Sequence, residues 1–122
     1  MKMLLITCLI LAALFTPFTN AADYIIDDKG AHASINFKIQ HLGYSWLTGR
    51  FNTFTGKFSY DPENISASSV EVNVDTSSIN SNHAERDKHL KGDDFLEIGQ
   101  FTNASFVSSS VKNNGDGSVS IN

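Results

Sequence analysis

Apolar and polar residues alternate one by one over several short stretches, and this alternation limits the fold more than any other feature of the sequence. From Ala33 to Ile39 every second residue is apolar, and from Val70 to Val74 each valine is followed by a polar residue. Because successive side chains of a strand point to opposite faces, a period of two is typical of strands with one buried and one solvated face. The sequence therefore predicts a mostly β fold.

A third run, from Trp46 to Tyr60, carries apolar residues on both odd and even positions. Phe51 has an odd residue number, whereas the aromatic residues that follow it have even numbers, so in one regular strand they would lie on opposite faces. A change of parity within one strand needs an extra residue, so we predict a bulge or bend near residues 52–53. Gly49 and Gly56 lie in the same run and indicate tight bends or the close approach of a neighbouring strand.

The second half of the sequence contains weaker strand signals. Residues 61–64 break the third run, and alternation returns over residues 104–111. Residues 112–118 form a strong turn signal, and the chain ends at Asn122 just as a further strand begins. We therefore expect residues 22–122 to be the N-terminal part of a single domain that belongs to a longer protein.

One short helix is predicted from Asn82 to Lys91. Asn82 can cap its first turn, Glu85 has the spacing of a capping box, and Gly92 marks its end. Two pairs at a separation of four residues, His83 with Asp87 and Glu85 with His89, raise the hypothesis of a metal site. Each pair supplies only two ligands where transition metals usually need three or four, so a solvated helix face is favoured.

The first 21 residues have the pattern of a cleaved secretory signal peptide. Lys2 precedes a thirteen-residue apolar run, and small residues end at Ala21. The run is shorter than the roughly 20 residues that a membrane-spanning helix needs. We predict cleavage after Ala21, export to a bacterial periplasm, and no stable membrane anchor.

Charge and cysteine content restrict the partners of the exported chain. The sequence has 9 basic and 13 acidic residues, and removal of residues 1–21 takes away Lys2 and Cys8, which leaves 8 − 13 = −5 and no cysteine. A disulfide framework is therefore excluded, and the fold must rely on an apolar core. The acidic balance argues against nucleic acid or an anionic membrane surface as a partner.

The aromatic stretch from Phe37 to Phe58 has two interpretations. Aromatic residues at strand spacing would fill the core of any small β domain, and the pattern alone favours this interpretation. However, Leu42, Tyr44 and neighbouring apolar residues surround a turn at Gly43, where chains are normally polar. Apolar residues at such a turn are consistent with the entrance of a ligand cavity.

Two long segments resemble signatures of a known family. The segment INFKIQHLGYSWLTGRFNTFTGKFSYD is similar to the opening signature of the YceI-like periplasmic polyisoprenoid-binding proteins. The segment VDTSSINSNHAERDKHLKGDDFLEIGQFTNASF is similar to their second signature, in which a strand ending in Asp-Thr-Ser precedes a helix carrying Arg-Asp-x-His-Leu. The resemblance extends over essentially all of residues 23–122.

This resemblance implies an antiparallel, lipocalin-like β-barrel with a short helix packed on it. The family barrel has eight strands, of which this chain would supply about five. An elongated apolar interior would hold an isoprenoid chain, such as a polyisoprenoid or the tail of an isoprenoid quinone, as a bound ligand. No catalytic residue, metal or other cofactor is then required, and the sequence leaves open whether two copies form a homodimer.

The expected ligand-binding residues come from the strands and the turn of the aromatic stretch and from later strands. Among them, His41, Tyr44 and Arg50 are the candidates for contact with a polar headgroup. The full set is Phe37, Ile39, His41, Leu42, Tyr44, Trp46, Leu47, Arg50, Phe51, Phe54, Phe58, Val72, Val74, Phe95 and Phe106.

Three alternatives stay open at this point. The ligand could be a fatty acid or fatty amide, which the same apolar wall would accept. The chain could be a metal-dependent periplasmic enzyme that uses the helix pairs named above. It could also be a stress-response structural protein whose cavity no longer binds a ligand.

Overall fold

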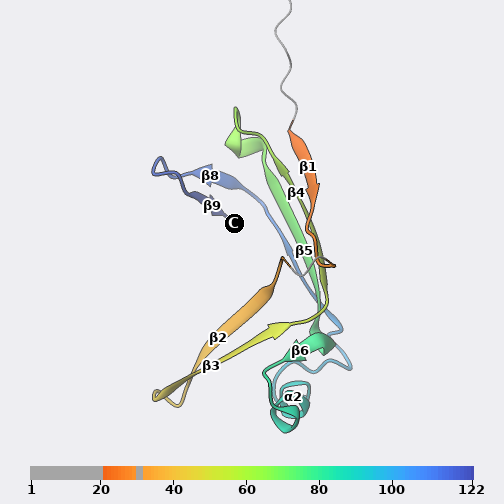
Figure 1. The fold of residues 1–122 in the computed structure, drawn as a ribbon. Helices are drawn as coiled ribbons and strands as arrows, with labels where there is room; N and C mark the ends of the chain where they lie inside the picture. The colour runs from red at the N-terminus through yellow and green to blue at the C-terminus, as the bar shows by residue number, and fades with distance from the viewer. Residues whose placement is uncertain (1–20, 30–31) are drawn as a thin grey trace, which may run out of the picture.

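The computed structural model describes residues 21–29 and 32–122, and these residues form an open, antiparallel β structure (Figure 1). The predicted signal peptide falls almost entirely outside the described residues. The strands are β1 (Ala22–Ile25), β2 (Ile35–His41), β3 (Ser45–Phe51), β4 (Phe54–Tyr60), β5 (Ser69–Asp75), β6 (Ile79–Asn80), β7 (Asn103–Val107), β8 (Val111–Asn113) and β9 (Val119–Ile121). The helical elements are η1 (Ile65–Ala67), η2 (Thr76–Ser78) and α2 (Ala84–Leu90).

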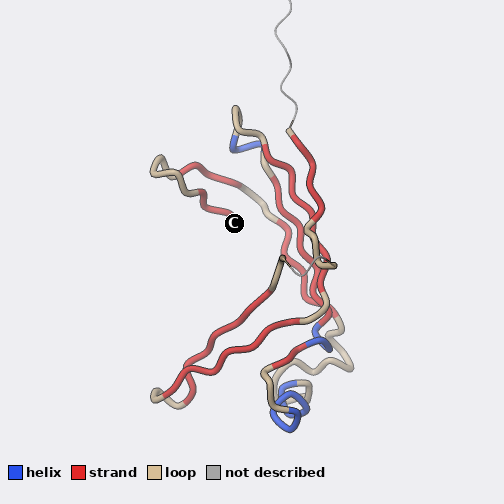
Figure 2. Tube along the Cα trace, viewed as in Figure 1, coloured by secondary structure: helices blue, strands red, loops and turns tan. Residues whose placement is uncertain are grey.

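The strands form three groups. Four of them make the main sheet, in the order β1-β4-β5-β7, while β2-β3-β6 and the hairpin β8-β9 form separate sheets. Figure 2 shows both hairpins, β2–β3 and β8–β9, leaving the same side of the main sheet near its opposite ends. The predicted mostly β, antiparallel fold with one short α-helix is confirmed, and over the described residues the sheets do not close into a barrel.

The described residues contain more strands than the five or so that we expected. The run over residues 46–60 divides into β3 and β4, and the run over residues 104–111 divides into β7 and the start of β8. β1 and β6 have four and two residues, which is too short for a recognisable alternation.

The predicted bend near residues 52–53 is present, and it separates two sheets instead of bulging one strand. Asn52 donates its N–H to the carbonyl of Ser78 at 3.0 Å, and the N–H of Thr53 donates to the Ser78 hydroxyl at 3.0 Å. The carbonyl of Thr53 accepts from the N–H of Asp75 at 3.0 Å. These backbone groups bond to the end of β5 and to η2, so β3 and β4 can leave in different directions.

Both glycines of this run allow a close approach, as predicted. A Cβ on Gly49 would collide with the ring of Phe37 and would lie 2.8 Å from the carbonyl oxygen of Asn80. A Cβ on Gly56 would lie 2.5 Å from the Ile26 side chain and 3.1 Å from the carbonyl of Glu71. Neither glycine is needed for a turn, because neither has a positive φ.

The helix is shorter than predicted, and its cap lies one residue later. Asn82 has a φ of 62° and is not the cap; instead, Nδ1 of His83 accepts from the N–H of Arg86 at 3.3 Å. The prediction of Asn82 as cap was wrong because the preceding Ser81 is hydrogen-bonded to Asp87, which turns the chain before the helix can start.

Few side chains of the described residues are buried, as expected for an open sheet. The buried apolar residues are Phe54, Ile79 and Val111, and the buried polar residues are Thr76 and Ser81. Most of them lie where the hairpin β2–β3, the main sheet and the segment before α2 meet. The packed part of the structure is therefore this junction, and the sheets extend from it with one apolar face each.

Candidate functional site

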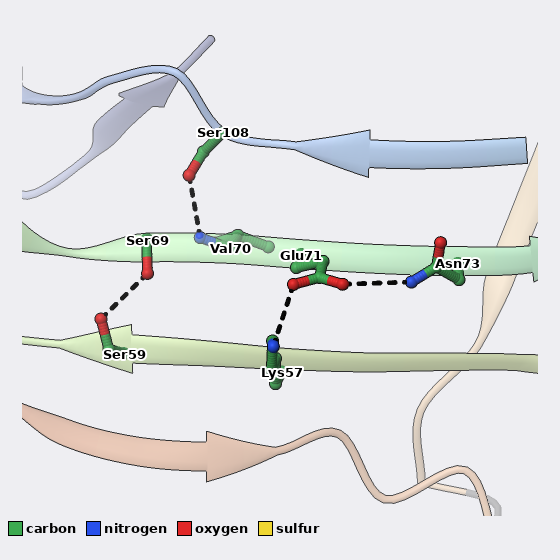
Figure 3. A network of polar contacts seen from close by, with 7 residues as sticks. All are labelled: Lys57, Ser59, Ser69, Val70, Glu71, Asn73 and Ser108. Atoms are coloured by element: carbon green, nitrogen blue, oxygen red, sulfur yellow. Dashed lines mark hydrogen bonds and ion pairs between the residues drawn. The ribbon is translucent and has the colours of Figure 1, made fainter.

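The main sheet has one polar and one apolar face. On the polar face Lys57 pairs with Glu71 at 3.0 Å, and the hydroxyls of Ser59 and Ser69 lie 3.1 Å apart (Figure 3). The Lys57 ammonium donates to the Glu71 carboxylate and lowers its pKa. A hollow of about 510 Å³ lies beside this ion pair, and its lining combines polar residues with apolar ones such as Ile25 and Val107.

We call the opposite face of the main sheet the apolar face. On it, aromatic and branched side chains of neighbouring strands lie directly opposite one another. The Tyr24 and Phe58 rings stack with centroids 4.7 Å apart, and Phe58 lies opposite Val70 on β5. One step along, Gly56, Val72 and Phe106 lie side by side on β4, β5 and β7, followed by Phe54, Val74 and Ala104. The alternation of the sequence thus produces a continuous apolar strip across the sheet.

The hairpin β8–β9 covers one end of the apolar face and leaves a small cavity there. The cavity has a volume of about 130 Å³. Its walls are mostly apolar, and they come from the sheet, from η1 and from both strands of the hairpin: Phe58, Tyr60, Ile65, Val70, Val111, Val119 and Ile121 with Ser59 and Ser68.

The hairpin β2–β3 also has two faces. The pairing of Ile35 with Phe51 and of Ile39 with Leu47 places these residues on one face, with Phe37, whose ring centroid lies 5.9 Å from that of Phe51. Because faces alternate along a strand, Trp46 and Arg50 lie on the other face. There, the Lys38 ammonium lies 4.5 Å from the centroid of the Trp46 ring.

The end of this hairpin is apolar and exposed. Leu42 and Gly43 have φ angles of 51° and 75°, and the Tyr44 N–H donates to the His41 carbonyl at 3.1 Å. Two consecutive positive φ angles are the mark of a type I′ turn, for which Asn-Gly is the preferred pair. A leucine in this conformation costs roughly 1–2 kcal/mol relative to its usual backbone conformation. Leu42 and Tyr44 are nevertheless 76% and 92% exposed.

The structure brings some of the predicted ligand-binding residues together and separates others. Five of them share the apolar face of the main sheet, and four share one face of the hairpin β2–β3. Trp46 lies on the other hairpin face, and Phe95 lies after α2, with its ring edge against His89 at 5.0 Å. The residues on the main sheet are Phe54, Phe58, Val72, Val74 and Phe106, and those on the hairpin are Phe37, Ile39, Leu47 and Phe51.

The three headgroup candidates do not form one cluster. His41 and Tyr44 lie at the turn of the hairpin, whereas Arg50 lies at its base, where Nε donates to the Asn52 side chain at 2.8 Å. Tyr24 and Val70 also lie on the apolar face and were not predicted. Val70 continues the alternation of Val72 and Val74 and could have been included, but β1 is too short to have indicated Tyr24.

The residues of the second sequence signature form structural contacts. The Asp75 carboxylate accepts from the Ser77 N–H at 2.8 Å and thereby caps η2. The buried Thr76 donates its hydroxyl to the carbonyl of Phe101 at 2.5 Å, and its N–H donates to the carbonyl of Thr102 at 3.1 Å. These bonds hold the end of β5 to the segment that leads into β7.

A second set of contacts fixes α2 to the main body. Ser81, which is 4% exposed, donates its N–H and its hydroxyl to one carboxylate oxygen of Asp87 at 2.8 and 2.5 Å. Arg86 donates from Nε to the Ser81 hydroxyl at 2.8 Å and from a terminal nitrogen to the Ser81 carbonyl at 2.6 Å. The Arg-Asp pair of the helix signature therefore binds the chain just before the helix.

These contacts make one part of the acid stability predictable. The Ser81 hydroxyl, followed by its N–H, lowers the pKa of Asp87 below its ordinary value. Because the pKa of Asp87 is lower in the folded state, its carboxylate stabilises the fold at pH values above the unfolded pKa of about 3.9. This stabilisation is lost as the pH falls through the lowered, folded-state pKa.

We expect Asp87→Asn to reduce the melting temperature at pH 7. We also expect the melting temperature of this variant to fall less than that of the original chain between pH 5 and pH 2. Thermal denaturation across pH, with the exposed Asp93→Asn as control, measures this. Equal acid sensitivity of Asp87→Asn and the original chain would contradict it.

The helix pairs that suggested a metal site are used in other ways. Nδ1 of His83 caps α2, Asp87 binds Ser81, and Nε2 of His89 lies 3.6 Å from the Asp94 carboxylate. Among residues 21–29 and 32–122, no three His, Cys, Asp or Glu side chains come together as metal ligands would. In the same residues, no helix has both the length and the apolar character needed to span a membrane.

Known proteins have closely similar sequences. A UPF0312 protein of Vibrio cholerae is 56% identical over 122 residues, which cover 99% of this chain and 65% of the relative. A UPF0312 protein of Shewanella oneidensis is 54% identical and is matched over 64% of its length. The chain therefore spans about two thirds of the length of these relatives.

Two solved structures have a similar fold. BcnA of Burkholderia cenocepacia matches with a TM-score of 0.68 and 18% identity, over 72% of this chain and 55% of that one. The YCEI protein of Campylobacter jejuni matches with a TM-score of 0.60 and 26% identity, over 80% of this chain and 56% of that one. The model of the YceI-like domain matches residues 24–122, which is most of the chain. The chain belongs to the YceI-like domain family.

Proposed function

We propose that this protein is an exported, non-enzymatic carrier that holds an isoprenoid chain against its apolar faces. The observation that carries the proposal is the apolar face of the main sheet, where Tyr24, Phe58 and Phe106 remain partly exposed although they lie in a continuous apolar strip. Exposed apolar surface of this extent, opposite a face that carries the Lys57–Glu71 ion pair and the serine pair, is typical of a binding surface and not of a solvent-facing one. Membership of the YceI-like family supports the same ligand class.

The apolar surfaces supply the affinity that such a ligand needs. Burial of a methylene group contributes about 0.8 kcal/mol, so one five-carbon isoprene unit contributes several kcal/mol before the cost of ordering the chain. The strip across the main sheet and the hairpin face that carries Phe37 and Phe51 offer several adjacent apolar side chains to such a ligand.

The signature contacts support a binding role over a catalytic one. Asp75, Thr76, Ser81, Arg86 and Asp87 are bonded to one another or to the backbone; Asp75 caps η2, and the other bonds hold neighbouring segments together. A catalytic acid, base or nucleophile must instead reach a substrate. These residues therefore maintain the shape of the apolar faces.

Mass spectrometry of lipid extracted from the natively purified full-length protein tests this proposal. We expect a prenyl chain in roughly stoichiometric amount, and its headgroup would identify the ligand. A protein that is consistently empty and that also rejects added prenyl alcohols and quinones would refute the proposal. A fatty acid or fatty amide in the same extract would replace the isoprenoid as ligand while leaving the carrier role in place. Enzymatic turnover that depends on a stoichiometric metal, detected by elemental analysis, would contradict the non-enzymatic role.

A further inference from the structure

The end of the hairpin β2–β3 has a chemical character that the ligand-binding faces do not explain. We define the tip as residues 39–46, which contain Leu42, Tyr44 and Trp46 at exposures of 76%, 92% and 60%. Trp46 lies on the hairpin face opposite Phe37 and Leu47, so a ligand held against those residues would not cover it. A leucine at the positive φ of a type I′ turn adds backbone strain where asparagine would add none.

Charge is distributed unevenly along the chain, and the tip lies in the basic part. Residues 29–60 contain Lys29, Lys38, Arg50 and Lys57 and no aspartate or glutamate, a net charge of +4. The other residues contain 9 − 4 = 5 basic and 13 acidic side chains, a net charge of −8. Lys57 is paired with Glu71 and Arg50 lies at the base of the hairpin, so Lys38 is the basic residue beside the tip, which projects from the sheet (Figure 1) and has no acidic residue of its own.

We propose that the tip docks onto the surface of a bilayer that contains anionic lipids. Leucine, tyrosine and tryptophan at the end of a projecting hairpin match the boundary between headgroups and acyl chains, where aromatic residues with a polar end are enriched. Lys38, held over the Trp46 ring, places a positive charge beside them, where it attracts anionic headgroups. This inference goes beyond the carrier function and does not depend on which ligand is bound.

Several features favour a bilayer over a protein partner. The tip is narrow: it consists of one turn and the last residues of two strands, whereas a stable protein interface buries roughly 800 Å² on each partner. A bilayer needs no complementary shape and accepts single inserted side chains. Attraction between Lys38 and anionic headgroups also orients the hairpin with its end toward the surface, because the acidic residues lie elsewhere.

Flotation of the mature full-length protein with vesicles tests the proposal. The vesicles are made of phosphatidylethanolamine and phosphatidylcholine, with or without roughly one third phosphatidylglycerol. We expect binding to the anionic vesicles, weakened by high salt, together with a blue shift in the emission of Trp46, the single tryptophan of the sequence. Equal binding to both vesicle types, or no binding to either, would overturn the proposal.

Substitutions in the turn separate docking from folding. Leu42→Asn places the preferred residue in the type I′ turn, so the melting temperature is expected to stay the same or rise, while vesicle binding falls about tenfold. Lys38→Gln is expected to reduce the preference for anionic vesicles about fivefold. Ile25→Asn is the matched control, because Ile25 is 87% exposed and lies on the polar face of the main sheet.

The same variants distinguish a bilayer from other partners that the tip could contact. Unchanged vesicle binding by Leu42→Asn, or an equal loss in Ile25→Asn, would overturn the proposal. A dimer that Leu42→Asn converts into a monomer in analytical ultracentrifugation, without vesicle binding by the original protein, would identify the tip as a contact between two copies. Trp46 emission that is already blue-shifted without vesicles would show that the full-length protein covers the tip, which also overturns docking.

Discussion

Val72→Trp is expected to reduce the isoprenoid that is recovered with the full-length protein about tenfold or more. Val72 lies on the central strand β5, between Gly56 and Phe106 and at the middle of the apolar face. Because the Ile26 side chain already covers Gly56, an indole at position 72 would extend over the middle of the apolar face, where the proposed ligand would lie. Excess volume in a packed apolar site costs about 1–3 kcal/mol, and each 1.4 kcal/mol is a factor of ten in affinity.

Asn73→Trp is the matched control for this variant. Asn73 is the next residue on β5 and points to the polar face, so the same indole is added outside the proposed site (Figure 3). We expect Asn73→Trp to retain its lipid, as measured by mass spectrometry of extracts from both variants at equal protein amounts. Equal lipid content in Val72→Trp and the original protein would show that the apolar face is not the binding site, even if the protein carries a lipid elsewhere.

The local alternation of the sequence was enough to predict the faces of the main sheet. Phe54, Phe58, Val72, Val74 and Phe106 come from three strands, and the register between the strands places them on one face. This prediction succeeded because the side-chain period of a strand does not depend on its partners. The family signatures then gave the antiparallel topology, which no single stretch of alternation specifies.

Other features depend on contacts between distant segments, and alternation does not predict them. The separation of β3 from β4 requires Ser78, which is about 25 residues away and accepts from Asn52 and Thr53. The start of α2 at Ala84 depends on the bonds between Ser81 and Asp87, because local capping rules favour Asn82. Trp46 is a different case: it was placed among the wall residues, but alternation along β3 puts it on the hairpin face opposite Leu47 and Phe51.

The sequence predicted the apolar character of the candidate site better than it predicted the positions of the residues that form it. The apolar turn at Leu42 indicated an apolar binding partner, and from the sequence it was predicted to lie at the mouth of the cavity. The turn lies at the end of a hairpin that projects from the main sheet (Figure 1), and whether it borders the ligand stays a prediction, while a cavity of about 130 Å³ lies under the hairpin β8–β9. Val111, Val119 and Ile121 line that cavity, and they were missed because β8 and β9 have only three residues each.

The largest loss of stability is expected from Phe54→Ala. Phe54 is 7% exposed and is the first residue of β4, directly after the bend that separates the hairpin β2–β3 from the main sheet. Truncation of a buried phenylalanine costs about 3–5 kcal/mol, because the ring loses its contacts and leaves a cavity. Small domains have a total unfolding free energy of only about 5–15 kcal/mol, so this single change removes a large part of it.

Chemical denaturation of the full-length protein measures this effect, with Phe101→Ala as the control. Phe101 has the same side chain at 55% exposure, so its truncation is expected to cost less than about 1 kcal/mol. Phe54→Leu keeps most of the buried volume and is expected to recover more than half of the loss. Equal losses in Phe54→Ala and Phe101→Ala would show that the junction is not the stabilising core. In that case the angle between the hairpin and the main sheet would not be fixed by packing, and the two apolar faces could not be treated as parts of one binding surface.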